Sequence, residues 1–328
     1  MKKRNYNIDI IKGLAIIAVI LIHSLPDEML LAILSPFYIW QAVPVFILLA
    51  GYNTAQSFQR RGYVSLNQFY NISFLYKKFE RLVYPFLFIW AIQVIIHFLM
   101  MDGLNLKTLV ISLFTGGWGP GSYFIPVIIQ ATLILPLIYM VIKRNLTAGV
   151  IVLFFISILV DVFCMMIDVS GSVYRIIIVR YIFALVLGVC LSLNTKNINY
   201  KWLIPLAMLS AVYIAGVYYQ EWEFFIERYW QSQHAPSYFW TLLLVIIGLR
   251  AYQFKAANPL SRLLVKMGQA SYHIFLVQMF YFWVIADGIS DFPLMIYLAI
   301  TLTICIVFGI LFFNAENRLR NRLKLQRQ

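Results

Sequence analysis

The stretch NIDIIKGLAIIAVILIHSLP, residues Asn7–Pro26, decides the fold class of this protein. Between Lys12 and His23 it contains only apolar residues, and about 20 mostly apolar residues are needed to cross a hydrocarbon core of roughly 30 Å. A basic N-terminus precedes the stretch, as in a signal peptide, but no small-residue cleavage site follows it. We therefore predict that this stretch contains the first membrane-spanning helix.

The composition of the 328 residues extends this prediction to the whole chain. Hydrophobic residues make up 62% and charged residues 12%, with a mean hydropathy of +0.82, whereas a soluble domain has about 25% charged residues. These values exclude a soluble globular protein and a disordered chain. Cys164, Cys190 and Cys305 lie in apolar runs without paired spacing, so we expect neither a disulfide framework nor a metal site.

Further apolar stretches follow the first one, and the predicted fold class is an all-α integral membrane protein, a bundle of about ten transmembrane helices. The predicted spans are Ile8–His23, Phe37–Ala55, Leu82–Met101, Tyr123–Ile142, Thr147–Phe163, Ile176–Leu193, Trp202–Tyr219, Tyr238–Tyr252, Ser271–Ala286 and Phe292–Phe313. The stretch Leu104–Phe114 is too short for a span and is expected to be an interfacial or re-entrant piece. No linker sets off a soluble region, so residues 1–328 are predicted to form a single membrane domain.

The lysines and arginines predict the orientation, because they accumulate on the cytoplasmic side of short loops. With the N-terminus inside, only four of the 26 basic residues fall outside, which leaves 22 inside; the four are Lys107, Arg175, Arg180 and Arg228. We therefore predict that both termini are cytoplasmic. This topology, with attraction to anionic membrane lipids, explains the net charge of +13 without a nucleic-acid partner.

The first span carries the most informative group of polar residues. At 100° per residue, Asp9, Lys12 and His23 share one helix face, and Lys12 and His23 lie about 16 Å apart along the axis. Histidine can accept and return a proton near neutral pH, which makes His23 a candidate general base. In the alternative interpretation, Lys12 extends to lipid headgroups and His23 satisfies a carbonyl at the helix end.

Several segments, in chain order, resemble the bacterial integral-membrane acyltransferases called acyltransferase family three. The first span, with a basic residue, ten others and a histidine, is similar to the pattern that opens this family. The other similar segments are VPVFILLAGY (Val43–Tyr52), KKFERLVYP (Lys77–Pro85), SYFIPVIIQATLILPLIY (Ser122–Tyr139) and MGQASYHIFLVQ (Met267–Gln278). The chain departs from the family patterns at Ala50, Ser122, Tyr123 and Gln278.

The resemblance implies an enzyme of the bacterial plasma (inner) membrane that transfers an acyl group from cytoplasmic acyl-CoA, most commonly acetyl-CoA. The implied acceptor is a hydroxyl of a cell-surface glycan or a lipid-linked sugar. His23 is the expected general base, while Lys12 and Asp9 complete the catalytic group. Arginine forks and lysine charges hold phosphate, and the expected acyl-CoA contacts are Arg60, Arg61, Lys78 and Arg81. An ordinary excess of positive charge on the inner side explains these four cations equally well.

Substrate contacts are expected from two sources. The matching segments supply Tyr123, Gln130, Tyr272 and Gln278, and the outer side supplies Arg180 and Trp222. Arg180 also fits a structural ion pair with Asp161, and Trp222 also fits an interfacial aromatic helix. We expect His97 and His273 to be ordinary core histidines, His234 to lie in an outer loop, and Gly116–Gly121 to be a flexible turn.

Two other functions compete with acyl transfer. A glycan or lipid-linked sugar transporter would also have about ten spans with basic inner mouths, although no inverted repeat or broken helix is visible in the sequence. A glycan polymerase is a third interpretation, but we would expect a long catalytic outer loop for it. Consumption of acetyl-CoA with release of free thiol separates the acyltransferase from both.

Overall fold

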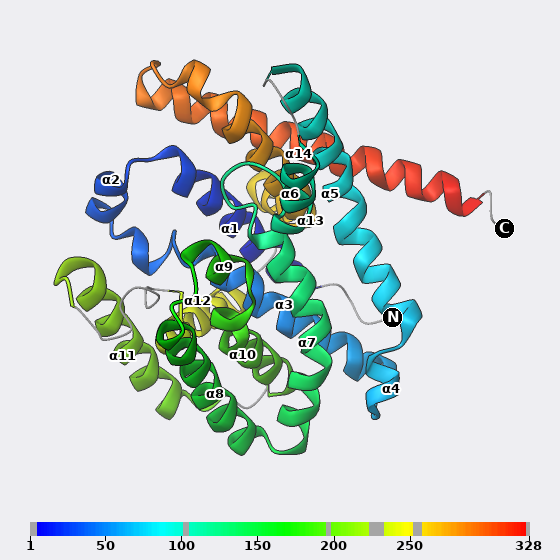
Figure 1. Cartoon of the computed structure of the whole chain (residues 1–328). Coiled ribbons are helices and arrows are strands. Elements are labelled where there is room, and N and C mark those ends of the chain that lie inside the picture. Colours follow the sequence, from blue (N-terminus) through cyan, green and yellow to red (C-terminus); the bar gives the residue numbers. More distant parts are fainter. Residues whose placement is uncertain (1–4, 101–104, 195–197, 223–232, 252–257, 326–328) are drawn as a thin grey trace. The chain divides into compact units, whose positions relative to one another are not determined.

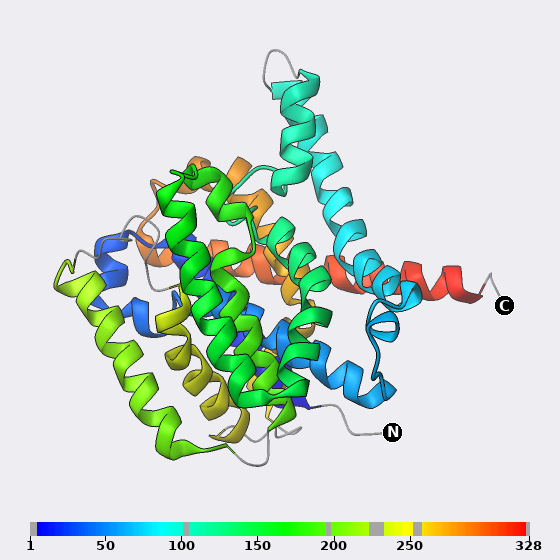
Figure 2. The same ribbon diagram turned by 60° about the horizontal axis from the view of Figure 1, so that its bottom comes forward.

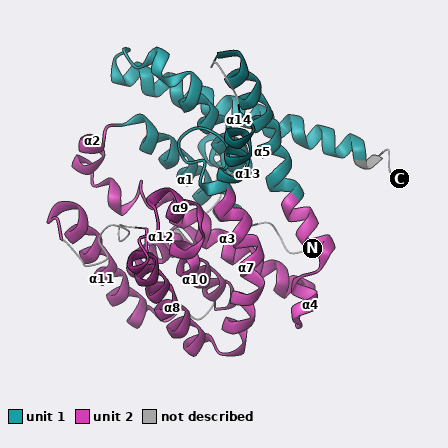
Figure 3. Ribbon diagram, in the orientation of Figure 1, with its two compact units in different colours: residues 1–25, 80–125, 252–328 teal, residues 26–79, 126–251 magenta. Residues whose placement is uncertain are grey.

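The computed structural model describes residues 5–100, 105–194, 198–222, 233–251 and 258–325 (Figure 1). Every regular element among these residues is a helix, which confirms the all-α prediction. The helices fall into two compact units (Figure 3). Unit 1 comprises residues 1–25, 80–125 and 252–328, and unit 2 comprises residues 26–79 and 126–251.

Unit 1 consists of helices from three separate parts of the chain. They are α1 (Tyr6–Ser24), most of α5 (Ile72–Met100), α6 (Leu106–Thr115), α13 (Pro259–Val284), η5 (Ala286–Ile289) and α14 (Leu294–Leu325). Unit 2 contains α2 (Asp27–Ala32), η1 (Ser35–Phe37), α3 (Ala42–Arg61), α4 (Leu66–Phe69), the start of α5, most of α7 (Phe124–Arg144), α8 (Leu146–Met166), α9 (Gly171–Ile176), η2 (Val179–Tyr181), α10 (Ile182–Leu193), α11 (Tyr200–Tyr219), η4 (Ala235–Ser237) and α12 (Tyr238–Ala251). The labels η mark short 3₁₀ helices.

Asparagine begins five of these helices. In each case its side-chain oxygen accepts a hydrogen bond from a backbone N–H of the first turn, which satisfies one of the donors that a helix start leaves unpaired. The five caps are Asn5, Asn105, Asn145, Asn199 and Asn258, before α1, α6, α8, α11 and α13. The polar residues between the apolar stretches thus define where the helices start.

Among the residues that the structure describes, seven helical segments are long and apolar enough to cross a membrane. They are Tyr6–Ser24, Ser35–Arg61, Leu66–Met100, Phe124–Arg144, Leu146–Met166, Tyr200–Tyr219 and Leu294–Leu323. Each of the ten predicted spans overlaps a helix, but the count of ten is not confirmed. The spans predicted at Ile176–Leu193 and Tyr238–Tyr252 fall on shorter apolar helices. Helix α13, which carries the span predicted at Ser271–Ala286, is not among the seven.

Unit 1 has its core where α1 crosses α13. At the crossing, a Cβ on Gly13 would overlap the carbonyl of Leu264, and a Cβ on Gly268 would overlap the carbonyl of Asp9. Small residues allow two helix backbones to approach this closely. Asp9 lies against Gly268, and His23, 14 positions after Asp9, contacts Phe282, 14 positions after Gly268. The two helices therefore run parallel. The crossing therefore fixes where the C-terminal end of α1 lies on α13.

Unit 2 is built around a similar crossing between α3 and α10. A Cβ on Gly51 would lie 2.5 Å from the carbonyl oxygen of Leu185, and a Cβ on Gly188 would overlap the backbone of Leu48. Helix α8 packs beside α10, and α11 packs beside α12 (Figure 2). The apolar stretch containing α3 is 67% buried, whereas that of α8 is 22% buried. Helix α3 is therefore central in this unit, and α8 presents much of its apolar surface outward.

Candidate functional site

Helix α1 carries the three residues predicted to be catalytic. Asp9 is buried in the first turn, and Lys12 and His23 are half-buried. The His23 ring lies 5.8 Å from the ring of Phe282 on α13. A Cβ added to Gly121 would lie 3.7 Å from His23 Nε2. The imidazole therefore lies between α13 and the loop that leads into α7.

The hydrogen bonds at the C-terminal end of α1 do not involve the His23 side chain. Ser24 Oγ donates to the Ile20 carbonyl at 2.7 Å, and the Leu25 N–H donates to the Leu21 carbonyl at 3.1 Å. Within the described part of the chain, we find no hydrogen bond from the His23 imidazole to another residue. Both ring nitrogens are therefore without a hydrogen-bond partner among the described residues.

Two of the predicted donor-binding cations contact the same aromatic ring in unit 2. The guanidinium carbon of Arg61, in the last turn of α3, lies 5.0 Å from the centroid of the Phe74 ring. Lys78 Nζ lies 5.1 Å from the same centroid and donates to Thr54 Oγ1 at 2.6 Å. A cation over an aromatic face is attracted by the ring quadrupole. Phe74 and Thr54 thus hold two positive charges at the end of α3.

The other two predicted cations are exposed. Arg60 donates from Nε to the carbonyl of Gln56 at 3.3 Å, one turn back on α3. Arg81 follows Lys78 by three residues along α5 and belongs to unit 1. Arg60 therefore lies beside Arg61 in the chain, whereas Arg81 belongs to the other unit.

The predicted substrate contacts are distributed over both units. In unit 1, Tyr272 donates from its hydroxyl to the Leu82 carbonyl at 2.7 Å, and Tyr123 is half-buried just before α7. Gln278, on α13, is fully buried, and both polar atoms of its amide lack a hydrogen-bond partner. A buried polar group without a partner costs about 1–3 kcal/mol. Gln278 is therefore the one of these residues in unit 1 whose hydrogen-bonding capacity is unused within the described residues.

In unit 2, Gln130 holds a backbone segment. Its Nε2 donates to the Ile176 carbonyl at 2.7 Å, and its Oε1 accepts from the Ile178 N–H at 3.0 Å. The Arg180 guanidinium stacks over the Tyr181 ring at 4.6 Å. Trp222 is exposed at 43%, and its ring packs closely over Gly216.

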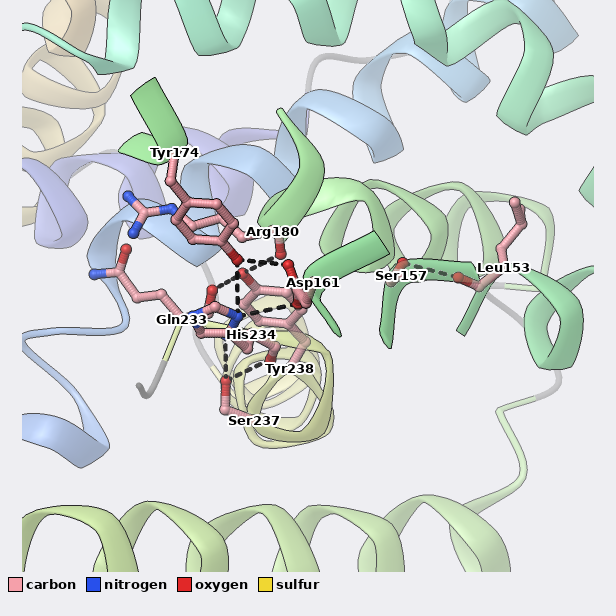
Figure 4. Close-up of polar contacts among 9 residues, drawn as sticks. All are labelled: Leu153, Ser157, Asp161, Tyr174, Arg180, Gln233, His234, Ser237 and Tyr238. Carbon is pink, nitrogen blue, oxygen red and sulfur yellow. Dashed lines mark hydrogen bonds and ion pairs between the residues drawn. The ribbon is translucent and has the colours of Figure 1, made fainter. Parts of the chain in front are cut away.

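A buried histidine–aspartate pair is the main polar cluster that the sequence did not indicate (Figure 4). His234 Nδ1 lies 3.1 Å from Asp161 Oδ2, and both side chains are 1% exposed. The Tyr174 hydroxyl donates to the other carboxylate oxygen, Oδ1. His234 lies in the connection between α11 and α12, as expected, but as the N-cap of η4 its side chain is buried inside unit 2, which the sequence did not indicate.

Electrostatics in this cluster follow from burial and from two neighbouring charges. Burial lowers the pKa of His234 below its ordinary value, with a smaller contribution in the same direction from Arg180, while Asp161 opposes the shift. Burial beside the Asp161 carboxylate raises the pKa of Tyr174. The two residues are therefore a neutral imidazole and a neutral phenol that both hydrogen-bond one carboxylate.

A second network ties three helices of unit 1 together. His273 Nε2, on α13, pairs with the Glu316 carboxylate on α14. Arg320 contacts Glu316 at 2.6 Å and Glu80, on α5, at 3.6 Å. His273 Nδ1 is buried without a hydrogen-bond partner. The network therefore joins α5, α13 and α14.

Comparison with known proteins identifies the class. Residues 5–313 match the model of the family described as "Acyltransferase domain", and the chain belongs to this family. The resemblance to acyltransferase family three is thereby confirmed, and the match covers residues of both units. A search of curated proteins and a search of solved structures gave no match. The protein is therefore an acyltransferase by family.

Within the described residues, no group of three or more histidine, cysteine or acidic side chains is placed to hold a metal ion. The three cysteines are free thiols, with Cys164 and Cys305 buried. The residues that sequence reasoning missed, His234 and Tyr174, lie 73 and 13 positions from Asp161. No local spacing indicates such a cluster.

Proposed function

We propose that this protein is an O-acyltransferase of the bacterial plasma (inner) membrane that moves an acyl group, most simply acetyl, from cytoplasmic acyl-CoA to a hydroxyl of a glycan or lipid-linked sugar. The family match across residues 5–313 carries the acyltransferase assignment. The donor, the acceptor and the catalytic residue are our proposal. They are supported by the polar groups of α1, α3 and α5.

In the proposed reaction, His23 Nε2 accepts the proton of the acceptor hydroxyl. The hydroxyl oxygen then forms an ester bond with the acyl carbon while the bond between that carbon and the CoA sulfur breaks. The proton passes from the imidazole to the departing thiolate, so His23 is returned neutral. The absence of a described protein hydrogen bond to the imidazole supports this role, because a base must be open to the hydroxyl that it deprotonates.

For the donor, we propose that Arg61 and Lys78 contact the phosphates of acyl-CoA, with Arg60 and Arg81 as further cations. Arginine and lysine make charge-assisted hydrogen bonds to phosphate. Phe74 and Thr54 restrict where the first two charges lie. Restricting a side chain before binding reduces the entropy lost when the phosphate binds.

The central test is His23→Ala in purified protein. We expect transfer of acetyl from acetyl-CoA to fall by about 10²–10⁴-fold, the usual contribution of a positioned proton acceptor. Acetyl-CoA affinity, measured by calorimetry, and the melting temperature are expected to stay close to wild type. Ile22→Ala, a truncation of the neighbouring half-buried residue of α1, is the matched control and should retain transfer.

A folded His23→Ala protein that keeps more than about a tenth of wild-type transfer would contradict the general-base role.

For the donor contacts, Lys78→Gln should weaken acetyl-CoA binding by about 10-fold or more, since charge-assisted bonds contribute about 1.5–3 kcal/mol. Lys77→Gln, which removes the same charge from an exposed neighbour, should have little effect. Equal effects of the two variants would mean that these charges serve membrane topology.

A further inference from the structure

The loop between α6 and α7, residues 116–121, is tightly packed within unit 1. Its four glycines all have positive φ, a backbone conformation that other residues rarely adopt; they are Gly116, Gly117, Gly119 and Gly121. A Cβ on Gly117 would lie 2.5 Å from Gln93 Oε1 on α5, and a Cβ on Gly119 would overlap the carbonyl of Met279 on α13. The expectation of a flexible turn therefore does not describe how this loop packs.

Gln93 fixes the centre of the loop. Its Nε2 donates to the Trp118 carbonyl at 2.6 Å, and its Oε1 accepts from the Trp118 N–H at 3.2 Å. Gln93 itself is completely buried. Two hydrogen bonds from one buried amide hold the backbone of Trp118 in a single position. The backbone that carries the indole is therefore fixed.

The Trp118 indole forms an aromatic cluster with residues of two helices. It stacks on Trp283 of α13 with ring centroids 5.6 Å apart and an interplanar angle of 17°, and His97 of α5 meets it edge-on at 4.9 Å. Both tryptophans are half-buried, so part of each ring stays accessible. Aromatic faces carry negative partial charge and attract the positive edges of C–H groups.

Polar atoms without partners lie in the same part of unit 1. His97 Nδ1 is buried without a hydrogen-bond partner, and so are both polar atoms of the Gln278 amide. Gln278 directly precedes Met279, whose carbonyl adjoins Gly119. Buried polar groups in proteins are normally paired with protein, water or ligand. We therefore expect these atoms to pair with a ligand that offers both donors and acceptors, or with water when no ligand is bound.

The loop also connects this aromatic cluster to the proposed base. Gly121, at its end, lies beside His23 Nε2 and beside the ring of Phe275. Gly121 follows Trp118 by three positions along the chain, and three extended residues span at most about 10 Å. That span is comparable to one sugar ring with its hydroxyl groups, so a ring held at Trp118 is within reach of His23.

We propose that loop 116–121, with Trp118, Trp283 and His97, forms the acceptor subsite and binds a pyranose ring. The inference rests on the proposed function and names its acceptor surface. A pyranose has a flat C–H face that fits the indole and a rim of hydroxyls that pair with His97 Nδ1 and the Gln278 amide. An acyl chain would leave those polar atoms unpaired, and a phosphate would meet aromatic faces instead of cations.

Trp118→Ala, Trp118→Phe and Trp202→Ala test the proposal. The probes are methyl glucopyranoside, methyl galactopyranoside and N-acetylglucosamine, each offered as acceptor with acetyl-CoA. We expect Trp118→Ala to raise the acceptor KM about 10-fold or more without changing the acetyl-CoA KM, because stacking on one aromatic ring contributes about 1–3 kcal/mol. Trp118→Phe, which keeps a flat ring, should recover most of the affinity, and Trp202→Ala, an exposed tryptophan of α11 in unit 2, should match wild type.

A binding measurement makes the result independent of catalysis. The same sugars are titrated into His23→Ala protein with tryptophan fluorescence as readout. The change in fluorescence on sugar binding is expected to disappear in the double variant that also carries Trp118→Phe. Unchanged acceptor KM in folded Trp118→Ala, or a loss of acceptor affinity confined to Trp202→Ala, would overturn the subsite. No fluorescence response to any of the sugars would overturn the pyranose assignment even if acetyl-CoA is consumed with another acceptor. If the wild-type protein bound the sugars but transferred no acetyl group from acetyl-CoA, the result would instead count against the proposed function.

Discussion

At the scale of single residues, the Asp161 carboxylate is held by two neutral donors. His234 and Tyr174 both hydrogen-bond it, and the positive charge of Arg180 lowers the pKa of each of them. A carboxylate buried with two hydrogen bonds avoids much of the cost of desolvation. The cluster also connects η4 to α8 and α9, because its three members come from these elements and their caps.

This cluster predicts how stability depends on pH. The pKa of His234 in the folded protein lies below its unfolded value of 6.5, so the unfolded chain binds more protons when the pH falls through that value. Stability is therefore expected to be present above about pH 6.5 and to fall as the pH drops below it. His234→Asn keeps a donor for Asp161 without a titrating ring, and its melting temperature should vary less between pH 7.5 and 5.5 than that of wild type.

Tyr174→Phe is the control for the pH experiment. It removes the other donor to Asp161 and leaves His234 in place, so it should lower the melting temperature at every pH while retaining the wild-type dependence on pH. Parallel pH curves for wild type and His234→Asn would show that His234 does not control this dependence.

At the scale of helices, both units contain the same kind of close helix crossing. In each unit, a pair of helices crosses on two glycines, each of which lies against the backbone of the other helix: Gly13 and Gly268 in unit 1, and Gly51 and Gly188 in unit 2. In unit 1, this crossing also determines the position of His23 relative to α13. A change at the crossing therefore affects both stability and the geometry around the proposed base.

Gly13→Ala is expected to destabilise the protein by about 1–3 kcal/mol or more, because the added methyl would overlap the Leu264 backbone and the helices would have to separate. Thermal unfolding in detergent measures the effect. Gly288→Ala makes the same chemical change where no atom lies within 4 Å of the added Cβ, and it should stay within about 0.5 kcal/mol of wild type. Equal stability of the two variants would show that the close crossing is not needed.

At the scale of the whole molecule, the distribution of basic residues predicts that both termini are cytoplasmic. Asn67 lies on the predicted inner side and Ser172 on the predicted outer side, and both are exposed. With Cys164, Cys190 and Cys305 replaced by alanine, Ser172→Cys should react with a membrane-impermeant thiol reagent in intact cells. Asn67→Cys should react only after the membrane is opened. Labelling of Asn67→Cys in intact cells would reverse the orientation.

The sequence alone determined the class of this protein and the positions of its helices. Hydrophobicity is a local property, so each predicted span overlaps a helix, although seven helical segments within the described part of the chain are long and apolar enough to cross a membrane by themselves. The shared face of Asp9, Lys12 and His23 is equally local, because it depends only on the pitch of one helix. The family resemblance followed from motifs of this kind, and the match to residues 5–313 confirms it.

Only the tertiary structure decided which residues from distant parts of the chain meet. His234 reaches Asp161 across 73 positions, and Trp118 stacks on Trp283, because helix packing brings their elements together. Neither contact has a periodicity or spacing that the sequence can reveal. The glycines of loop 116–121 illustrate the reason: the sequence shows their number, whereas their φ values and the atoms that they touch depend on the helices packed around them.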